Sequence, residues 1–171
     1  MTTQPVSGAA PAPPPAASDR TRAVRAALEE LVIEFAYCVD RGPVGSAADL
    51  FAPDGWYGQG PGRRSTGREA IREAYRLRAA AGPRTARHIM TNMRFQEIDA
   101  THWSGQSIML IFAENGTPPL PAQPLLVADV EDVFVHRDGR WMFQSRQLTD
   151  IFADPARTTV LPLSARENAR S

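Results

Sequence analysis

Ala86-Arg-His-Ile-Met-Thr-Asn-Met-Arg-Phe95, near the middle of the chain, decides the fold because it has the composition of a long β-strand. Side chains of a strand alternate between two faces, so His88, Met90 and Asn92 are expected on one face of the sheet. A histidine and an amide on the apolar side of a sheet either find polar partners in the core or line a cavity that admits a ligand. His88 is therefore a candidate for chemistry, and a core histidine bonded to a backbone carbonyl is the alternative.

The chain after this stretch is predicted to be β-structure. Residues 87–98, 103–114, 125–135 and 140–149 have the length and composition of four long strands. Asp138-Gly139 predicts a hairpin turn, and the short connections predict an antiparallel meander. The proline-rich residues 117–124 are expected to form a loop at the rim of the sheet, where they would act as a mouth or lid.

The chain before this stretch is predicted to be helical. Residues 1–17 are rich in Ala and Pro and predict a disordered tail, because they lack the apolar side chains that offset the entropy of ordering. Ser18 or Asp19 supplies an N-cap for a long amphipathic helix, and Gly42-Pro43 ends it.

Shorter elements follow the long helix. A second helix is expected over residues 46–51 with Ser46 as its cap, followed by a turn over residues 53–55 and a strand that begins at Trp56. A third helix is expected to begin at a capping box over residues 66–69 and to end at Gly82-Pro83.

Helices followed by an antiparallel meander indicate an α+β fold. We expect a cone-shaped α+β barrel, in which the long N-terminal helix and the two shorter helices pack in a curved antiparallel sheet. Residues 18–153 would form this single domain, and residues 154–171 a C-terminal extension.

The composition excludes several classes of protein. The 19 basic and 19 acidic residues balance, so neither a nucleic acid nor a membrane surface is an expected partner. The basic residues are all arginine, and the absence of lysine excludes Schiff-base chemistry and a Walker-type phosphate loop. Cys38 is the single cysteine, so no internal disulfide forms, and we expect a small hydrophobe in a cytoplasmic protein. No metal site is expected, because no two histidines have ligand spacing.

Asp40 lies at the C-terminal end of the predicted long helix, where the helix dipole disfavours a negative charge by about 0.3–1 kcal/mol. The unfavourable position of the Asp40 carboxylate therefore calls for a compensating interaction or a function. Either Arg41 or a nearby amide compensates the charge, or the carboxylate serves as a general base. The sequence leaves both explanations open.

The chain resembles the SnoaL-like branch of the nuclear transport factor 2-like superfamily, which also includes scytalone dehydratase, ketosteroid isomerase and limonene epoxide hydrolase. The resemblance covers about residues 19–150. Five stretches carry it: residues 35–41, 49–54, 67–74 and 132–146, and Arg87-His88 with Asn92.

The resemblance implies that Asp40 and His88 face each other in a cavity as a general acid/base pair. It also implies that Arg146 binds an anionic part of the ligand near the acid Asp132, although the two could equally form a structural ion pair. Phe35 stands where such members often have a tyrosine, so Tyr57 or Asn92 would have to stabilise an oxyanion. Ala86 replaces a threonine often found before Arg-His.

These residues and the resemblance together imply a lyase or isomerase that uses no cofactor and acts on a small cyclic, steroid-like or polyketide-like molecule. Asp40 and His88 would be catalytic. The expected substrate-binding residues are Tyr57, Asn92, Asp132, Arg146, Trp56 and Met90.

Two alternatives come from the same fold. One is a non-catalytic ligand-binding module or a partner subunit like the small subunit of a ring-hydroxylating dioxygenase, and the other is an epoxide hydrolase. A homo-oligomer, a dimer or trimer, is expected to form through the apolar surface of the sheet and the apolar residues 151–152 and 160–163.

Overall fold

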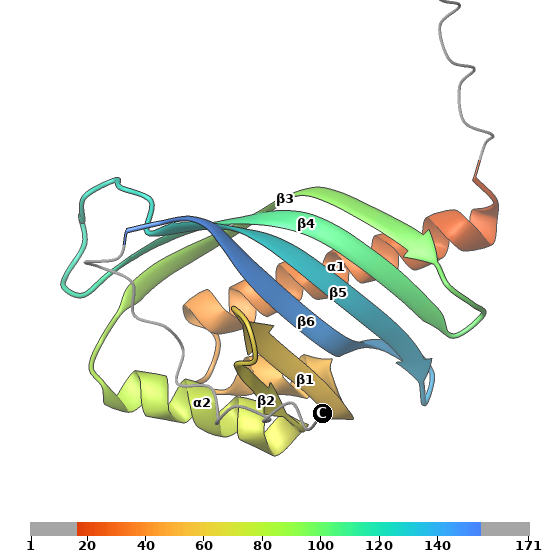
Figure 1. Ribbon diagram of the computed structural model, residues 1–171, viewed down its shortest axis with the longest axis horizontal. Coiled ribbons are helices and arrows are strands. Elements are labelled where there is room, and N and C mark those ends of the chain that lie inside the picture. Colours follow the sequence, from red (N-terminus) through yellow and green to blue (C-terminus); the bar gives the residue numbers. More distant parts are fainter. Residues whose placement is uncertain (1–16, 155–171) are drawn as a thin grey trace, which may run out of the picture.

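The computed structural model describes residues 17–154 (Figure 1), so most of the predicted tail and extension, and the apolar residues 160–163, lie outside the described residues. Its helices are α1 (Asp19–Arg41), the 3₁₀ helix η1 (Ser46–Leu50) and α2 (Arg68–Ala80). Its strands are β1 (Phe51–Gln59), β2 (Arg64–Thr66), β3 (Thr85–Glu97), β4 (His102–Glu114), β5 (Leu126–Arg137) and β6 (Arg140–Ala153). No helix among the described residues is both long and apolar enough to cross a bilayer.

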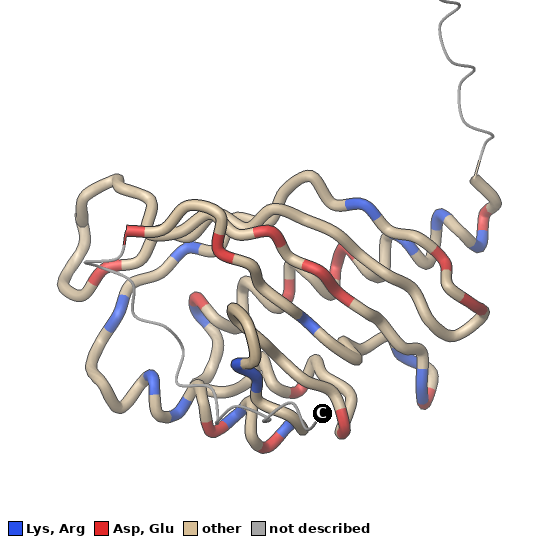
Figure 2. The backbone as a smooth tube through the Cα atoms, viewed as in Figure 1, with Lys and Arg blue, Asp and Glu red and all other residues tan. Residues whose placement is uncertain are grey.

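The six strands form one curved sheet in the order β2-β1-β6-β5-β4-β3. The four long strands β3 to β6 make the predicted antiparallel meander, but β1 pairs with β6 in parallel, so the sheet is mixed. Figure 1 shows the long strands arching over α1, with α2 beside the short strands. The expected α+β cone is therefore confirmed, with two α-helices and a 3₁₀ helix. Figure 2 shows acidic and basic positions mixed along the chain.

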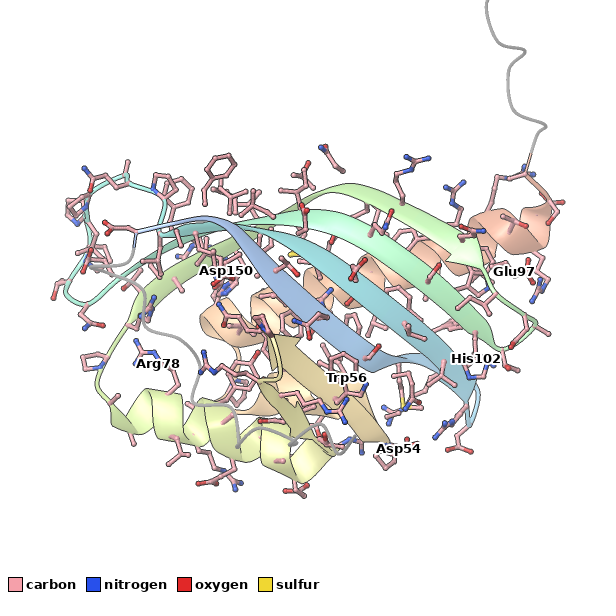
Figure 3. The ribbon with its side chains drawn as sticks, in the orientation of Figure 1. Asp54, Trp56, Arg78, Glu97, His102 and Asp150 are labelled. Carbon is pink, nitrogen blue, oxygen red and sulfur yellow. The ribbon has the colours of Figure 1, made fainter. Side chains whose placement is uncertain are left out.

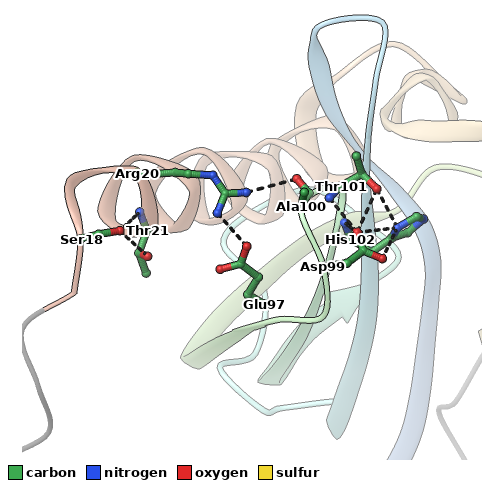
Figure 4. A network of polar contacts seen from close by, with 8 residues as sticks. All are labelled: Ser18, Arg20, Thr21, Glu97, Asp99, Ala100, Thr101 and His102. Atoms are coloured by element: carbon green, nitrogen blue, oxygen red, sulfur yellow. Dashed lines mark hydrogen bonds and ion pairs between the residues drawn. The ribbon is translucent and has the colours of Figure 1, made fainter.

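Helix α1 is fastened to β3 at both of its ends. At its start the Ser18 hydroxyl accepts from the Thr21 backbone N–H at 3.1 Å, which confirms the predicted cap. Arg20 donates to the Glu97 carboxylate at 2.7 Å and to the Ala100 carbonyl at 3.2 Å, which joins α1 to the turn after β3 (Figure 4). The other end of α1 meets the start of β3, as described below.

Three local predictions are wrong. The capping box at residues 66–69 does not form, because Thr66 belongs to β2 and pairs with Trp56, so Gly67 precedes α2 without a side-chain cap. Gly45, at φ +83°, takes the capping position expected for Ser46, since a left-handed backbone favours glycine. No turn separates residues 53–55 from the strand: they lie inside β1, where the β1–β6 register shifts between Phe51 and Trp56.

A β-bulge at Asn92 divides β3. Thr91 pairs with Ile108 and Arg94 with Gln106, so two residues of β3 oppose one residue of β4. Asn92 has φ +53°, a left-handed conformation that asparagine tolerates better than most residues. The extra residue changes the face on which each following side chain lies. Before the bulge the inward residues have even numbers, and after it they are Met93 and Phe95.

The core contains an arginine among aromatic rings. Arg146 on β6 donates from Nε and Nη2 to the two carboxylate oxygens of Asp132 on β5, both at 2.8 Å. Its guanidinium carbon lies 4.3 Å from the ring centroid of Phe35 and 4.3 Å from that of Phe143. The Arg146 side chain is fully buried and that of Asp132 is 3% exposed. The pair therefore joins β5, β6 and α1 inside the core.

We predict that Arg146→Met lowers the free energy of unfolding by about 3–5 kcal/mol, because it leaves the Asp132 carboxylate buried without its partner. Urea denaturation measures this loss. Replacing both residues (Arg146→Met with Asp132→Leu) should recover most of it, since no buried charge remains. Arg137→Met, which removes an exposed ion pair to Asp54, should cost less than about 1 kcal/mol. Equal losses in the single and double variants would contradict the pairing.

The turn between β3 and β4 predicts a pH-dependent stability. Asp99 accepts hydrogen bonds from the backbone N–H groups of Thr101 at 2.7 Å and His102 at 2.8 Å (Figure 4). These bonds, those from Thr101 first, lower the pKa of Asp99 from its ordinary 3.8 to about 2. The folded state therefore holds the carboxylate ionised where the unfolded chain would bind a proton. The resulting stabilisation is present above about pH 4 and is lost as the pH falls towards 2.

Thermal denaturation between pH 7 and pH 2.5 checks this prediction. Asp99→Asn should lower the melting temperature at neutral pH and should flatten its decline in acid, because the titrating group is gone. Asp129→Asn, on an exposed position of β5, serves as the control and should follow the wild type. Parallel acid curves for wild type and Asp99→Asn would contradict the prediction.

Candidate active site

Asp40 and His88 meet where the last turn of α1 crosses the start of β3. The Asp40 Oδ1 atom lies 2.6 Å from the His88 Nδ1 atom, and Oδ2 accepts from the His88 backbone N–H at 2.8 Å. An ionised carboxylate only accepts hydrogen bonds, so a bond to an ionised Asp40 requires a proton on Nδ1, and in the neutral ring Nε2 then keeps a free lone pair. The side chains are 9% and 14% exposed. The contact expected from the resemblance is confirmed, and His88 supplies the compensation that Asp40 needs at a helix C-terminus.

Both residues line a cavity of about 390 Å³ between α1, α2 and the sheet. Ligand pockets for small organic molecules hold ~300–1,000 Å³, so the cavity is of the size for one such molecule. Apolar side chains make most of its wall, among them Phe35, Val39, Ile111, Leu125, Leu126 and Leu148.

Two tyrosines face the cavity, Tyr57 from β1 and Tyr75 from α2. Their ring centroids lie 6.4 Å apart, and Tyr57 stacks on Phe35 at 6.1 Å. Among the described residues neither hydroxyl has a hydrogen-bond partner. Burial raises the pKa of Tyr57 and that of Tyr75 well above their ordinary value, so both phenols keep their protons at neutral pH. Each is therefore an O–H donor available to a ligand.

Gln59 and Cys38 are two further polar side chains of the wall. The Gln59 amide donates to the Asp150 carboxylate oxygens at 3.2 and 3.3 Å, which fixes the direction of the amide. The Cys38 thiol donates to Glu34 at 3.4 Å, and burial raises its pKa. A thiol with a raised pKa is a poor nucleophile, so Cys38 contributes packing, as expected.

The structure places five of the predicted site residues outside the cavity: Trp56, Met90, Asn92, Asp132 and Arg146. Met90 and the exposed Asn92 border a second cleft beside Arg25 and Glu29, because the bulge at Asn92 ends the alternation that would have aligned Asn92 with His88. The guanidinium carbon of Arg64 lies 5.4 Å from the centroid of the Trp56 ring, and Trp56 is not among the residues that line the cavity. Asp132 and Arg146 pair with each other in the core, and the Phe35 ring that covers Arg146 lines the cavity in its place.

Two further predictions concern the loop over residues 117–124 and metal binding. Residues 117–124 do not line the cavity, although Leu125 and Leu126 directly after them do. Within residues 17–154 no three His, Cys, Asp or Glu side chains gather in a way that could hold a metal ion.

Sequence reasoning missed Tyr75 and Arg78 as residues of the cavity wall. Both lie on the face of α2 that carries the buried Ile71 and Ala74, at the helical spacing that identifies an inward face. That spacing was the signal. Gln59 gave no such signal, because it lies at the end of β1 beside a glycine-rich connection.

Several solved structures have this fold. A protein named "Putative Scytalone Dehydratase" from Novosphingobium aromaticivorans matches with TM-score 0.72 and 21% identity, over 90% of this chain and 98% of that one. A Catenulispora acidiphila protein in complex with S-DNPA matches with TM-score 0.65 and 26% identity, over 75% and 94%. ActVI-ORFA from Streptomyces coelicolor matches with TM-score 0.65 and 18% identity, over 75% and 98%. No protein of curated function matches the sequence significantly.

The family comparison covers most of the domain. The sequence model of the SnoaL-like domain matches residues 20–147, from the first turn of α1 to the middle of β6. The matched range includes Asp40, His88 and every side chain of the cavity wall except Leu148. The chain therefore belongs to the family of SnoaL-like domain proteins.

Proposed function

We propose that this protein is a cofactor-independent lyase or isomerase that moves a proton on a small, mostly apolar cyclic ketone of the polyketide or steroid kind. One observation carries the proposal: the His88 ring, held by the Asp40 carboxylate at 2.6 Å, opens into an apolar cavity of about 390 Å³. A histidine fixed in one tautomer by a carboxylate is the arrangement that general base catalysis needs.

The proposed reaction begins at the Nε2 atom of His88, which takes a proton from the carbon next to the substrate carbonyl. The electron pair of the C–H bond moves towards the carbonyl and forms an enolate, and Asp40 stabilises the imidazolium that results. A tyrosine hydroxyl, that of Tyr57 or Tyr75, donates to the enolate oxygen, because Asn92 lies outside the cavity. If the His88 imidazolium returns its proton to a departing β-hydroxyl, water leaves and the reaction is a dehydration; if it returns the proton to another carbon, the reaction is an isomerisation.

The relatives support a reaction of this class. One structural relative carries the name of a dehydratase, and another holds S-DNPA as its ligand. Epoxide hydrolysis has less support, since it would need an Asp-Arg-Asp relay around a water. Asp40 is the only carboxylate among the described lining residues, and Asp132 and Arg146 are committed to each other.

We predict that the protein accelerates exchange of the α-protons of 2-tetralone, a bicyclic ketone, for deuterium in D₂O, measured by proton NMR. His88→Gln should reduce the accelerated rate by about 10²–10⁴-fold, because the general base is removed. Asp40→Asn should reduce it by about 10-fold or more, since the tautomer of His88 is no longer fixed.

The chain offers a matched control in a second Asp–His pair. His102 lies 3.1 Å from Asp99 at the far end of the sheet, and Figure 3 shows it well away from Arg78 at the cavity. His102→Gln should exchange 2-tetralone like the wild type. Binding of 2-tetralone without exchange would favour the non-catalytic ligand-binding alternative, and equal loss in His88→Gln and His102→Gln would contradict the assignment.

We also propose a homo-oligomer, most simply a dimer, that buries the end of β6. Ile151 and Phe152 there are 49% and 69% exposed, although both are large and apolar. Sedimentation velocity should give a dimer mass for the wild type and a smaller mass for Phe152→Asp. Ile98→Asp, a change at another exposed apolar residue, should keep the wild-type mass. A monomeric wild type would contradict the proposal.

A further inference from the structure

The cavity wall has an unbalanced charge. Its charged and titratable side chains, among the described lining residues, are Asp40, His88, Arg78 and Arg84, together with the tyrosines and Cys38, which are neutral at pH 7. Both carboxylate oxygens of Asp40 are hydrogen-bonded to His88. Arg84 has an interaction of its own, so Arg78 is the arginine that adds positive charge to a wall whose single carboxylate is already engaged. Figure 2 shows basic positions recurring along α2 and in the segment that leads into β3.

Arg78 differs from the other arginines of α2. Arg68 donates to the Phe51 carbonyl, Arg72 to Asp49 and Glu69, and Arg76 lies 3.8 Å from Glu73. Among the described residues the Arg78 guanidinium has no hydrogen-bond or ion-pair partner, although the residue is half-buried.

The position of Arg78 follows from the helix. It lies three residues after Tyr75 and seven after Ile71, on the face of α2 that turns inward. Figure 3 shows Arg78 on the side of α2 that faces the sheet. The last turn of a helix stabilises a cation, but this effect leaves the N–H donors of the guanidinium free. A half-buried guanidinium without a counter-ion beside an apolar cavity is arranged to receive an anion.

We propose that Arg78 binds an anionic group of the ligand, a carboxylate, so that the substrate is a small apolar ring compound that carries an acid. A guanidinium binds a carboxylate through two parallel hydrogen bonds, which adds orientation to affinity. The acid would lie against α2 and the apolar rings would extend along Phe35 and Leu148 towards His88. The inference rests on the proposed function only in that it concerns the same cavity. Arg146 is not available for this role, because Asp132 neutralises it in the core.

Isothermal titration of two probes tests the inference. 2-Naphthylacetate carries the carboxylate, and 2-naphthylacetamide is its neutral counterpart of nearly equal size. The wild type should bind the acid at least ~10-fold more tightly than the amide, the effect of a charge-assisted hydrogen bond. Arg78→Gln should abolish this preference by weakening the acid alone, and Arg78→Lys should keep part of it.

Arg76→Gln is the matched control, because Arg76 lies on the same helix with an exposed side chain and a partner in Glu73. It should bind both probes like the wild type. Equal affinity of the wild type for acid and amide, or an equal loss of both in Arg78→Gln, would overturn the inference.

The probes separate this inference from the proposed function. Preference for the acid through Arg78, without exchange of 2-tetralone, would support the anion site and remove the catalytic proposal. Exchange of 2-tetralone with no preference for the acid would leave the catalytic proposal standing and overturn the anion site.

Discussion

The buried pair of Arg146 and Asp132 is the interaction on which the rest of the structure depends. Taking two charges out of water is costly, and the two parallel hydrogen bonds of 2.8 Å repay that cost only in one arrangement. The pair therefore selects a unique packing more than it adds net stability. Because the Phe35 and Phe143 rings enclose the guanidinium, the pair also fixes the rotation of α1 against the sheet. Asp40 lies five residues after Phe35 on the same helix, so the rotation of α1 that places Phe35 also places the Asp40 carboxylate beside His88.

Each of the two aspartates that face the interior has one basic partner, and the partner determines what the carboxylate can do. Asp132 faces a guanidinium that stays charged, so the pair has no proton to exchange. Asp40 faces an imidazole, a side chain that can both accept and release a proton, and His88 lines the cavity. The fold thus separates the pair buried in the core from the pair at the cavity by one layer of aromatic side chains, in which the Phe35 ring both covers Arg146 and lines the cavity.

Much of this could be predicted from the sequence, because local patterns determine it. The periodicity of α1, the alternation of the long strands and the Asp138-Gly139 turn are local, and the family resemblance supplied the contact of Asp40 with His88. The parallel pairing of β1 with β6 joins segments far apart in the chain, and no local pattern indicates it. The bulge at Asn92 was not predicted because asparagine is also compatible with a regular strand position. Arg78 was not predicted as a residue of the cavity wall, since an arginine on a helix is usually exposed.

The extra residue in β3 makes this strand two half-strands of opposite phase. The first half presents Ala86 and His88 to the cavity, and the second presents Met93 and Phe95 to the core beneath the first turns of α1. A strand without the bulge would couple these two tasks, because any shift that improved one half would turn the side chains of the other half outward. Because the bulge at Asn92 resets the alternation, the residues of the half that lines the cavity can change without turning the core residues of the other half outward.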